Sequence, residues 1–276
     1  MLTSAAPPIV SASDLRLELK SLKDAIVSEI REGPSAATEY REMSHISATF
    51  VNAACVERGW RLAIRDIPQG AIDLAKSLKM SPYNWRPGRS EVDIGERQAT
   101  PGLLAHLKGS MPEALRRQLR FIDVRGGAPL KLVTGLRKDG KAAGRTSVEG
   151  FSDAGLTETN FAPPGNVMSC FLQCAAAIDW KTPLAMKEDD VAPQLIAQLL
   201  ALVQMTRRPS PILIAGTDLA TAFRFLMLEG RVVYEFLQSD GSPLTIELGL
   251  AVLCHYLPMS MDAVRAFIEE HRRVRE

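Results

Sequence analysis

The sequence has few residues of the kinds that mark disulfide-rich or zinc-binding proteins. Four cysteines in 276 residues do not make a disulfide framework, and they suit a reducing compartment. Cys170 and Cys174 have C-x3-C spacing, but no second pair stands at matching spacing, so we expect them to pack as small hydrophobic residues. The four histidines are scattered, which disfavours a zinc hydrolase. G-x-S-x-G, Walker and G-x-G-x-x-G motifs are absent as well.

The sequence also lacks a surplus of either charge and any long apolar run. It contains 33 basic and 32 acidic residues, so contact with nucleic acid would depend on local basic clusters rather than on a global field. No apolar span reaches 18 residues, and the start MLTSAAPPIV lacks the basic end and long apolar core of a secretion signal. We therefore expect an intracellular protein of the cytoplasm or nucleus with no membrane partner.

The first part of the chain is predicted to be helical. Residues 1–12 are rich in Pro, Ser and Ala and predict a flexible tail. Beyond them, apolar residues recur at steps of three and four, which is the period of an amphipathic helix. The predicted helices cover residues 13–33, 39–58, 71–80 and 101–121, the last with a break near residues 109–112. We therefore expect a helical N-terminal region over residues 13–125.

Two features of this region could contact nucleic acid. Arg116, Arg117 and Arg120 form a basic face, which is either a solvated helix surface, the default, or a phosphate contact. Trp85, in a loop rich in Pro, Asn and Gly, could stack on a base, although a tryptophan more commonly pins such a loop to the protein. Both alternatives stay open at this point.

From about residue 129 the pattern changes to short apolar or alternating runs separated by turn residues. These predict three strands, a helix, and then further strands. The predicted strands are Leu130–Leu136, Ser147–Thr157, Met168–Lys181, two within Pro211–Leu228, and 231–237, with a helix over Val191–Met205 and two C-terminal helices over Leu244–Tyr256 and Met261–Arg273. Residues 126–276 should therefore form an α/β domain, with a mixed central sheet of about five strands flanked by helices.

The third predicted strand ends in an acid and a lysine two residues apart. Residues i and i+2 of a strand lie on one face, roughly 7 Å apart. Asp179 and Lys181 would therefore stand side by side at a strand end, within reach of a divalent metal and a scissile phosphate. Such a pair is also common by chance as a solvated ion pair, and Asp153 in SDAG could be a turn former.

The order of these pieces resembles that of the PD-(D/E)XK nuclease superfamily, whose core has a helix, three strands, a helix and a strand. The pieces that carry the resemblance are SDAG, AIDWKTP, QLIAQLLALVQ and PILIAGTDLATAFRF, within residues 115–240. The last is similar to the "TDG" strand-turn of superfamily members in fungal and oomycete proteins, including Crinkler-type effectors. Asp179 stands where the superfamily often has glutamate, and Leu219 where it often has glycine.

The resemblance implies a restriction-endonuclease-like core that hydrolyses phosphodiesters with Mg²⁺ or Mn²⁺. Asp153 and Asp179 would hold the metal, and Lys181 would orient or deprotonate a water molecule and stabilise developing negative charge. Glu149 could add a ligand. The helix after the third strand could position the metal shell or the backbone through two amides, Gln194 and Gln198.

Two functions follow as hypotheses. The first is a nuclease, with DNA favoured over RNA as the substrate. The second is a non-catalytic, effector-like interaction module that keeps the fold and binds a protein or a nucleic acid, because a fold can lose its metal site. The near-neutral net charge and the lack of a long basic stripe favour the second.

Overall fold

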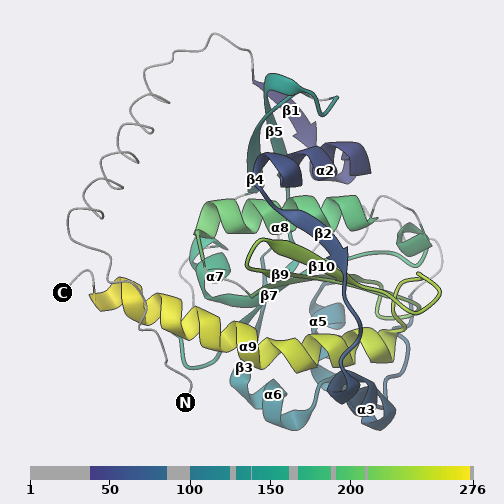
Figure 1. The fold of residues 1–276 in the computed structure, drawn as a ribbon. Helices are drawn as coiled ribbons and strands as arrows, with labels where there is room; N and C mark the ends of the chain where they lie inside the picture. The colour runs from purple at the N-terminus through teal and green to yellow at the C-terminus, as the bar shows by residue number, and fades with distance from the viewer. Residues whose placement is uncertain are drawn as a thin grey trace, which may run out of the picture. The chain divides into compact units, whose positions relative to one another are not determined.

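The structure, a computed structural model, has a mixed α/β fold with two sheets (Figure 1). It describes residues 38–85, 100–124, 129–137, 139–161, 167–187, 191–208 and 211–273. The predicted tail and the first predicted helix, residues 13–33, lie outside the described residues. Among the described residues there are seven α-helices, one three-stranded sheet and one seven-stranded sheet.

The larger sheet is mixed, in the order β2-β10-β9-β8-β7-β6-β3. Its strands are β2 (Arg61–Ile64), β3 (Leu119–Asp123), β6 (Ala154–Glu158), β7 (Cys174–Trp180), β8 (Ile212–Thr217), β9 (Phe223–Glu229) and β10 (Val232–Phe236). The pairs β7–β8 and β2–β10 are parallel, and the other neighbours are antiparallel. Every residue of β7 and β8 is buried, as expected for central strands covered on both faces.

The smaller sheet has the order β1-β5-β4. Its strands are β1 (Glu39–Glu42), β5 (Ala142–Gly150) and β4 (Leu130–Leu136). In β4, residues alternate between buried and more exposed, so one face of this sheet is packed and the other is more open. The chain leaves β5 at Gly150 and enters β6 at Ala154, so three residues connect the two sheets.

Helices cover both faces of the larger sheet. The helices are α2 (Ala48–Glu57), α3 (Gln69–Ser77), α5 (Thr100–Ser110), α6 (Glu113–Gln118), α7 (Val167–Gln173), α8 (Val191–Thr206) and α9 (Ile246–Arg273). Figure 1 shows α8 between the smaller sheet and strands β7–β10, with α9 on the opposite face. Because α8 packs against both sheets it is apolar almost all round, which is typical of a buried helix.

A glycine brings α8 close to β8. A Cβ atom at Gly216 would lie 2.9 Å from Cδ1 of Leu195 on α8, so a larger side chain would require the Leu195 side chain or the helix to shift. Gly216 is also the register partner of Asp179 on the neighbouring strand. The absence of a side chain at 216 therefore sets how near α8 comes to the Asp179 strand end.

Several predicted elements agree with the structure. The Leu130–Leu136 strand is β4, the Val191–Met205 helix is α8 to within one residue, and the Ala71–Met80 helix corresponds to α3. The strands within Pro211–Leu228 and 231–237 correspond to β8, β9 and β10. Among the described residues, no helix is both long and apolar enough to cross a membrane.

The prediction of a purely helical stretch before residue 125 was wrong, because it contains three strands. The predicted helix 39–58 is instead β1, a 3₁₀ turn (η1, Met43–His45) and α2, whose cap is the Ser47 hydroxyl accepting from the Phe50 N–H. For residues 101–121 the predicted break near residues 109–112 is confirmed, because α5 ends at Ser110 and α6 begins at Glu113. The end of that stretch is not helical but is β3, which pairs with β6. The short strands β1 and β2 are held by distant partners, β5 and β10, which a local pattern does not reveal.

Four later predictions were also wrong. The continuous strand 147–157 is broken at residues 151–153, where the chain crosses between sheets. The run 168–181 begins as α7 and becomes β7 only at Cys174. The two C-terminal helices are the single helix α9 with Pro258 inside it, and the larger sheet has seven strands rather than about five.

Candidate functional site

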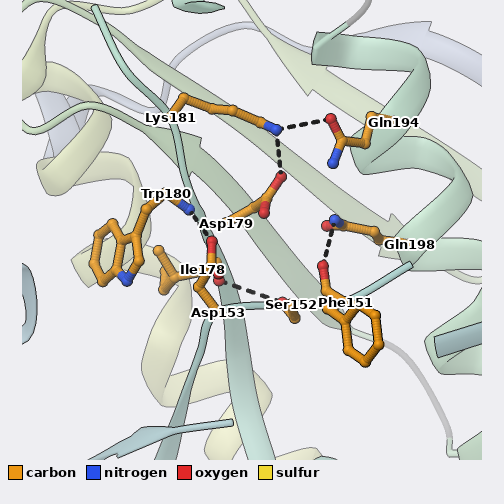
Figure 2. A network of polar contacts seen from close by, with 9 residues as sticks. All are labelled: Phe151, Ser152, Asp153, Ile178, Asp179, Trp180, Lys181, Gln194 and Gln198. Atoms are coloured by element: carbon orange, nitrogen blue, oxygen red, sulfur yellow. Dashed lines mark hydrogen bonds and ion pairs between the residues drawn. The ribbon is translucent and has the colours of Figure 1, made fainter. Parts of the chain in front are cut away.

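Asp153 and Asp179 stand next to each other at the ends of two paired strands. Strands β6 and β7 are antiparallel with Ala154 opposite Ile178, so the next residues, Asp153 and Asp179, are neighbours across the pair. The Asp153 backbone N–H donates to the Ile178 carbonyl at 3.0 Å. Its carboxyl Oδ2 accepts from the Trp180 N–H at 2.7 Å (Figure 2).

The β7 strand turns Asp179 and Lys181 toward α8. Ala177 packs in the hydrophobic cluster that includes Leu195 of α8, whereas Ile178 packs in the cluster on the α9 side. Alternation along the strand places Asp179 and Lys181 on the Ala177 face. The relative exposure of Asp179 is 4% and that of Lys181 is 5%, so both charges are buried in the molecule.

Lys181 is held by the acid and by an amide from α8. Its Nζ lies 3.2 Å from Oδ2 of Asp179 and donates to Oε1 of Gln194 at 2.7 Å (Figure 2). The Lys181 backbone N–H donates to the Thr217 carbonyl at 3.0 Å, which continues the pairing of β7 with β8. The ammonium is therefore fixed beside the carboxyl pair instead of moving freely in solvent.

The carboxyl pair favours one bound proton. Burial raises the pKa of Asp153 well above its ordinary value, and the charge of neighbouring Asp179 raises it further. The hydrogen bond from Trp180 N–H and the charge of Lys181 oppose this rise in the pKa of Asp153 without cancelling it. The folded surroundings of Asp153 therefore favour its protonated form more than water does.

The residues just before Asp153 are anchored to α8 and β7. The Gln198 side-chain amide, with 0% relative exposure, donates to the Phe151 carbonyl at 2.9 Å (Figure 2). The Ser152 hydroxyl donates to the Ile178 carbonyl at 3.3 Å. These two bonds fix the connection between the sheets and with it the direction of the Asp153 side chain.

The site residues fit a magnesium or manganese ion in part. Oδ2 of Asp179 is buried, and among the described residues it accepts no well-aligned hydrogen bond; the Lys181 ammonium 3.2 Å away balances its charge. A divalent cation could bind at Asp153 and Asp179, since Mg²⁺ is commonly bound by one or two carboxylates and several water molecules. No cluster of three or more His, Cys, Asp or Glu suited to a metal occurs within the described part of the chain.

Glu149 lies on the smaller sheet. Its carboxylate forms an ion pair with Lys131 at 2.9 Å, and it lines a cavity together with Gln194 and Phe151. The prediction placed it on the same strand face as Asp153, but the break at 151–153 separates the two residues into different sheets. Phe151, which the sequence reasoning did not select, is exposed in this cavity; its place two residues before Asp153 was the only available signal.

The three arginines do not form one helical face. Arg116 and Arg117 lie on α6, where Arg117 forms an ion pair with Glu113, whereas Arg120 lies on β3. Arg120 donates to the carbonyls of Phe161 and Thr159, at 3.2 and 3.4 Å. Arg120 therefore holds the turn after β6.

Trp85 pins its loop to the protein. Its indole N–H donates to the Asp218 carbonyl at 2.7 Å. Asp218 itself organises the turn between β8 and β9, because its carboxylate accepts from three successive backbone N–H groups, those of Ala220, Thr221 and Ala222. In this turn Leu219 has φ of 53°, a left-handed conformation that glycine adopts more easily.

No protein-family model and no curated protein matched the chain in the comparisons. The description of the protein therefore rests on its fold and its candidate site. This is a mixed α/β protein in which buried Asp179 and Lys181 and half-buried Asp153 lie at the ends of adjacent central strands.

Proposed function

We propose that the protein hydrolyses phosphodiester bonds of nucleic acid in a metal-dependent reaction, with DNA favoured over RNA. The observation that carries the proposal is the convergence of Asp153, Asp179 and Lys181 on the α8 side of the sheet. A buried carboxyl group and a half-buried one beside a fixed, buried ammonium have an energetic cost that a purely structural role does not need.

The order of elements around the site supports a relation to the PD-(D/E)XK superfamily. In the larger sheet and its helices, α6 is followed by β3, β6, β7, α8 and β8. This is the order of helix, three strands, helix and strand that the superfamily core has, with β4, β5 and α7 as insertions. Asp153 directly precedes the second of these strands, Asp179 lies on the third, and Lys181 directly follows it.

Each residue has a distinct task in the proposed reaction. Asp153 and Asp179 would hold the divalent cation, which when bound supplies charge neutralisation and a more acidic water. Lys181, 3.2 Å from Asp179, would orient the attacking water and stabilise negative charge as it develops on the phosphate. Gln194 holds the ammonium in place through its 2.7 Å bond and would limit its movement during the reaction.

The test is cleavage of supercoiled plasmid and linear DNA with Mg²⁺ or Mn²⁺. We expect wild type to cut and Lys181→Met to cut about 10²- to 10³-fold more slowly, the usual loss when one charge-stabilising donor is removed. Asp153→Asn and Asp179→Asn should be at least as impaired. The matched control is Lys76→Met on α3, whose ammonium also pairs with an acid, Asp73, at 2.9 Å but is largely exposed.

Equal trace cutting by wild type and Lys181→Met would contradict the catalytic proposal. In that event, salt-sensitive DNA binding without cleavage would favour the interaction module with a nucleic-acid partner. Failure to bind DNA at all would direct attention to a protein partner. Circular dichroism of each variant separates loss of chemistry from loss of fold.

A further inference from the structure

A cavity adjoins the carboxyl–lysine site on the side of the smaller sheet. Its volume is about 460 Å³, within the range of about 300–1,000 Å³ typical of small-ligand pockets. Gln194 lines it, and the same side chain accepts from Lys181, so one residue belongs to both the cavity and the site. Whatever fills the cavity is therefore next to the group that would meet the scissile phosphate.

The cavity wall combines an aromatic ring with hydrogen-bond acceptors. Phe151 is 51% exposed although it directly precedes the buried Ser152, and its ring points away from the carboxyl pair (Figure 2). Glu42 of β1 and Glu149 of β5 are register partners on neighbouring strands, so both carboxylates lie on one face of the smaller sheet. Gly150 has no side chain where η1 packs, since a Cβ there would lie 2.7 Å from Cβ of Met43.

This chemistry suits a nucleobase and disfavours a phosphate. The described residues that line the cavity include two carboxylates and no Lys or Arg, although Glu149 is paired with Lys131 at 2.9 Å outside the lining. Carboxylates accept hydrogen bonds from the amino and imino N–H groups of a base. An exposed aromatic ring stacks on a base and contributes about 1–3 kcal/mol per base. Guanine has adjacent N1–H and N2–H donors that match one carboxylate, and cytosine and adenine have one amino group. Thymine and uracil have no amino group.

We propose that this cavity binds one unpaired, amino-bearing base, guanine best, next to the phosphate that is cut. The base must be unpaired, because in a duplex its donors are already used by its partner. The inference rests on the proposed hydrolytic function for the neighbouring phosphate, but base binding by the cavity is measurable without cleavage. It specifies the substrate as DNA with an unpaired nucleotide rather than uniform duplex.

The first experiment compares duplexes that carry a single unpaired dG, dC, dA, dT or abasic nucleotide with the fully paired duplex. We expect wild type to cut beside dG at least tenfold faster than beside dT or the abasic site. In Phe151→Ala and Glu149→Gln this dG preference should fall to near one. Tyr40→Ala is the matched control, because Tyr40 is an exposed aromatic on the same sheet that does not line the cavity, and it should keep the preference.

The second experiment measures binding of dGMP and dTMP by titration calorimetry in EDTA, which prevents metal-dependent cleavage. We expect dGMP to bind at least fivefold more tightly than dTMP, and the difference to vanish in Phe151→Ala. Cleavage without base preference, or equal binding of the two nucleotides, overturns the cavity inference and leaves the hydrolytic proposal standing. Selective dGMP binding without cleavage of any DNA supports the cavity and overturns the hydrolytic proposal instead.

Discussion

At the scale of single residues, Asp153 links stability to function. Its folded-state pKa is raised, so the folded protein holds this proton more tightly than the unfolded chain, whose aspartate has a pKa of about 3.9. Its contribution to stability is therefore fully favourable below that unfolded value. It declines as the pH rises, until the raised pKa of Asp153 is passed. A bound cation would reverse this loss, because the metal requires the ionised pair.

The Asp153→Asn variant should accordingly be more stable than wild type in EDTA at neutral pH, although inactive. The asparagine oxygen can still accept from the Trp180 N–H, and its neutral amide lacks the charge repulsion with Asp179 that an ionised Asp153 would have. Thermal melts from pH 4 to pH 8 measure this. We expect a rise in Tm of about 2–4 °C for each kcal/mol gained, growing with pH. An Asp153→Asn melting temperature equal to or below that of wild type at pH 8 would show that ionisation of Asp153 does not destabilise the folded protein.

At the scale of elements, the sequence predicted best those helices and strands whose own pattern of apolar residues matches their secondary structure. Strand β4 alternates buried and exposed residues over its full length, and α8 keeps a helical apolar stripe. Prediction failed for elements whose secondary structure depends on contacts with distant parts of the chain. The alternation of Glu149, Phe151 and Asp153 continues across the crossing between sheets, so it looks like one strand. The apolar residues of α7 are of the same kind as those of β7, so the sequence does not mark where the helix ends and the strand begins.

The candidate site, too, was predicted only in part. Asp179 and Lys181 were found because i and i+2 in a strand share a face, and Asp153 because of its order in the resemblance. The cavity beside them was not predictable, since η1, β5 and α8 contribute to it from distant parts of the chain. Strand spacing indicates neighbours along a strand, and cavities depend on how separate elements pack.

The contact between α8 and β8 should control both stability and the site. Gly216→Ala places a methyl group 2.9 Å from Leu195 Cδ1, and overpacking of this kind costs about 1–3 kcal/mol. It should also slow DNA cutting, because α8 carries Gln194 and its bond to Lys181. Urea denaturation and plasmid cleavage measure the two effects.

A double-mutant cycle identifies the cause. Leu195→Ala alone should cost about 2–5 kcal/mol, and adding Gly216→Ala to it should cost less than Gly216→Ala costs in wild type. The matched control is Gly109→Ala on α5, where a Cβ meets nothing within 4 Å; it should be neutral or stabilise by up to about 1 kcal/mol. Additive costs at 195 and 216 would show that the strain at Gly216 is not against α8.

At the scale of the whole molecule, the net charge of +1 gives no general attraction for nucleic acid, so a few local contacts must carry it. On α6 these would be Arg116 and Arg117, whereas Arg120 is bonded to the carbonyls of Phe161 and Thr159. The three arginines are adjacent in the sequence but have different roles in the structure. A measurement of salt dependence can separate them.

Binding of duplex DNA to Asp153→Asn protein, measured by fluorescence anisotropy in EDTA at several salt concentrations, should show a shallow slope of log K against log salt. Each phosphate contact contributes about 0.9 to that slope. Arg116→Ala and Arg117→Ala should each reduce it by about one contact. Arg120→Ala should leave the slope unchanged and lower the melting temperature, because it releases the turn after β6. An unchanged slope in both α6 variants would exclude α6 as the phosphate contact, and DNA would then have to approach Lys181 from the cavity side.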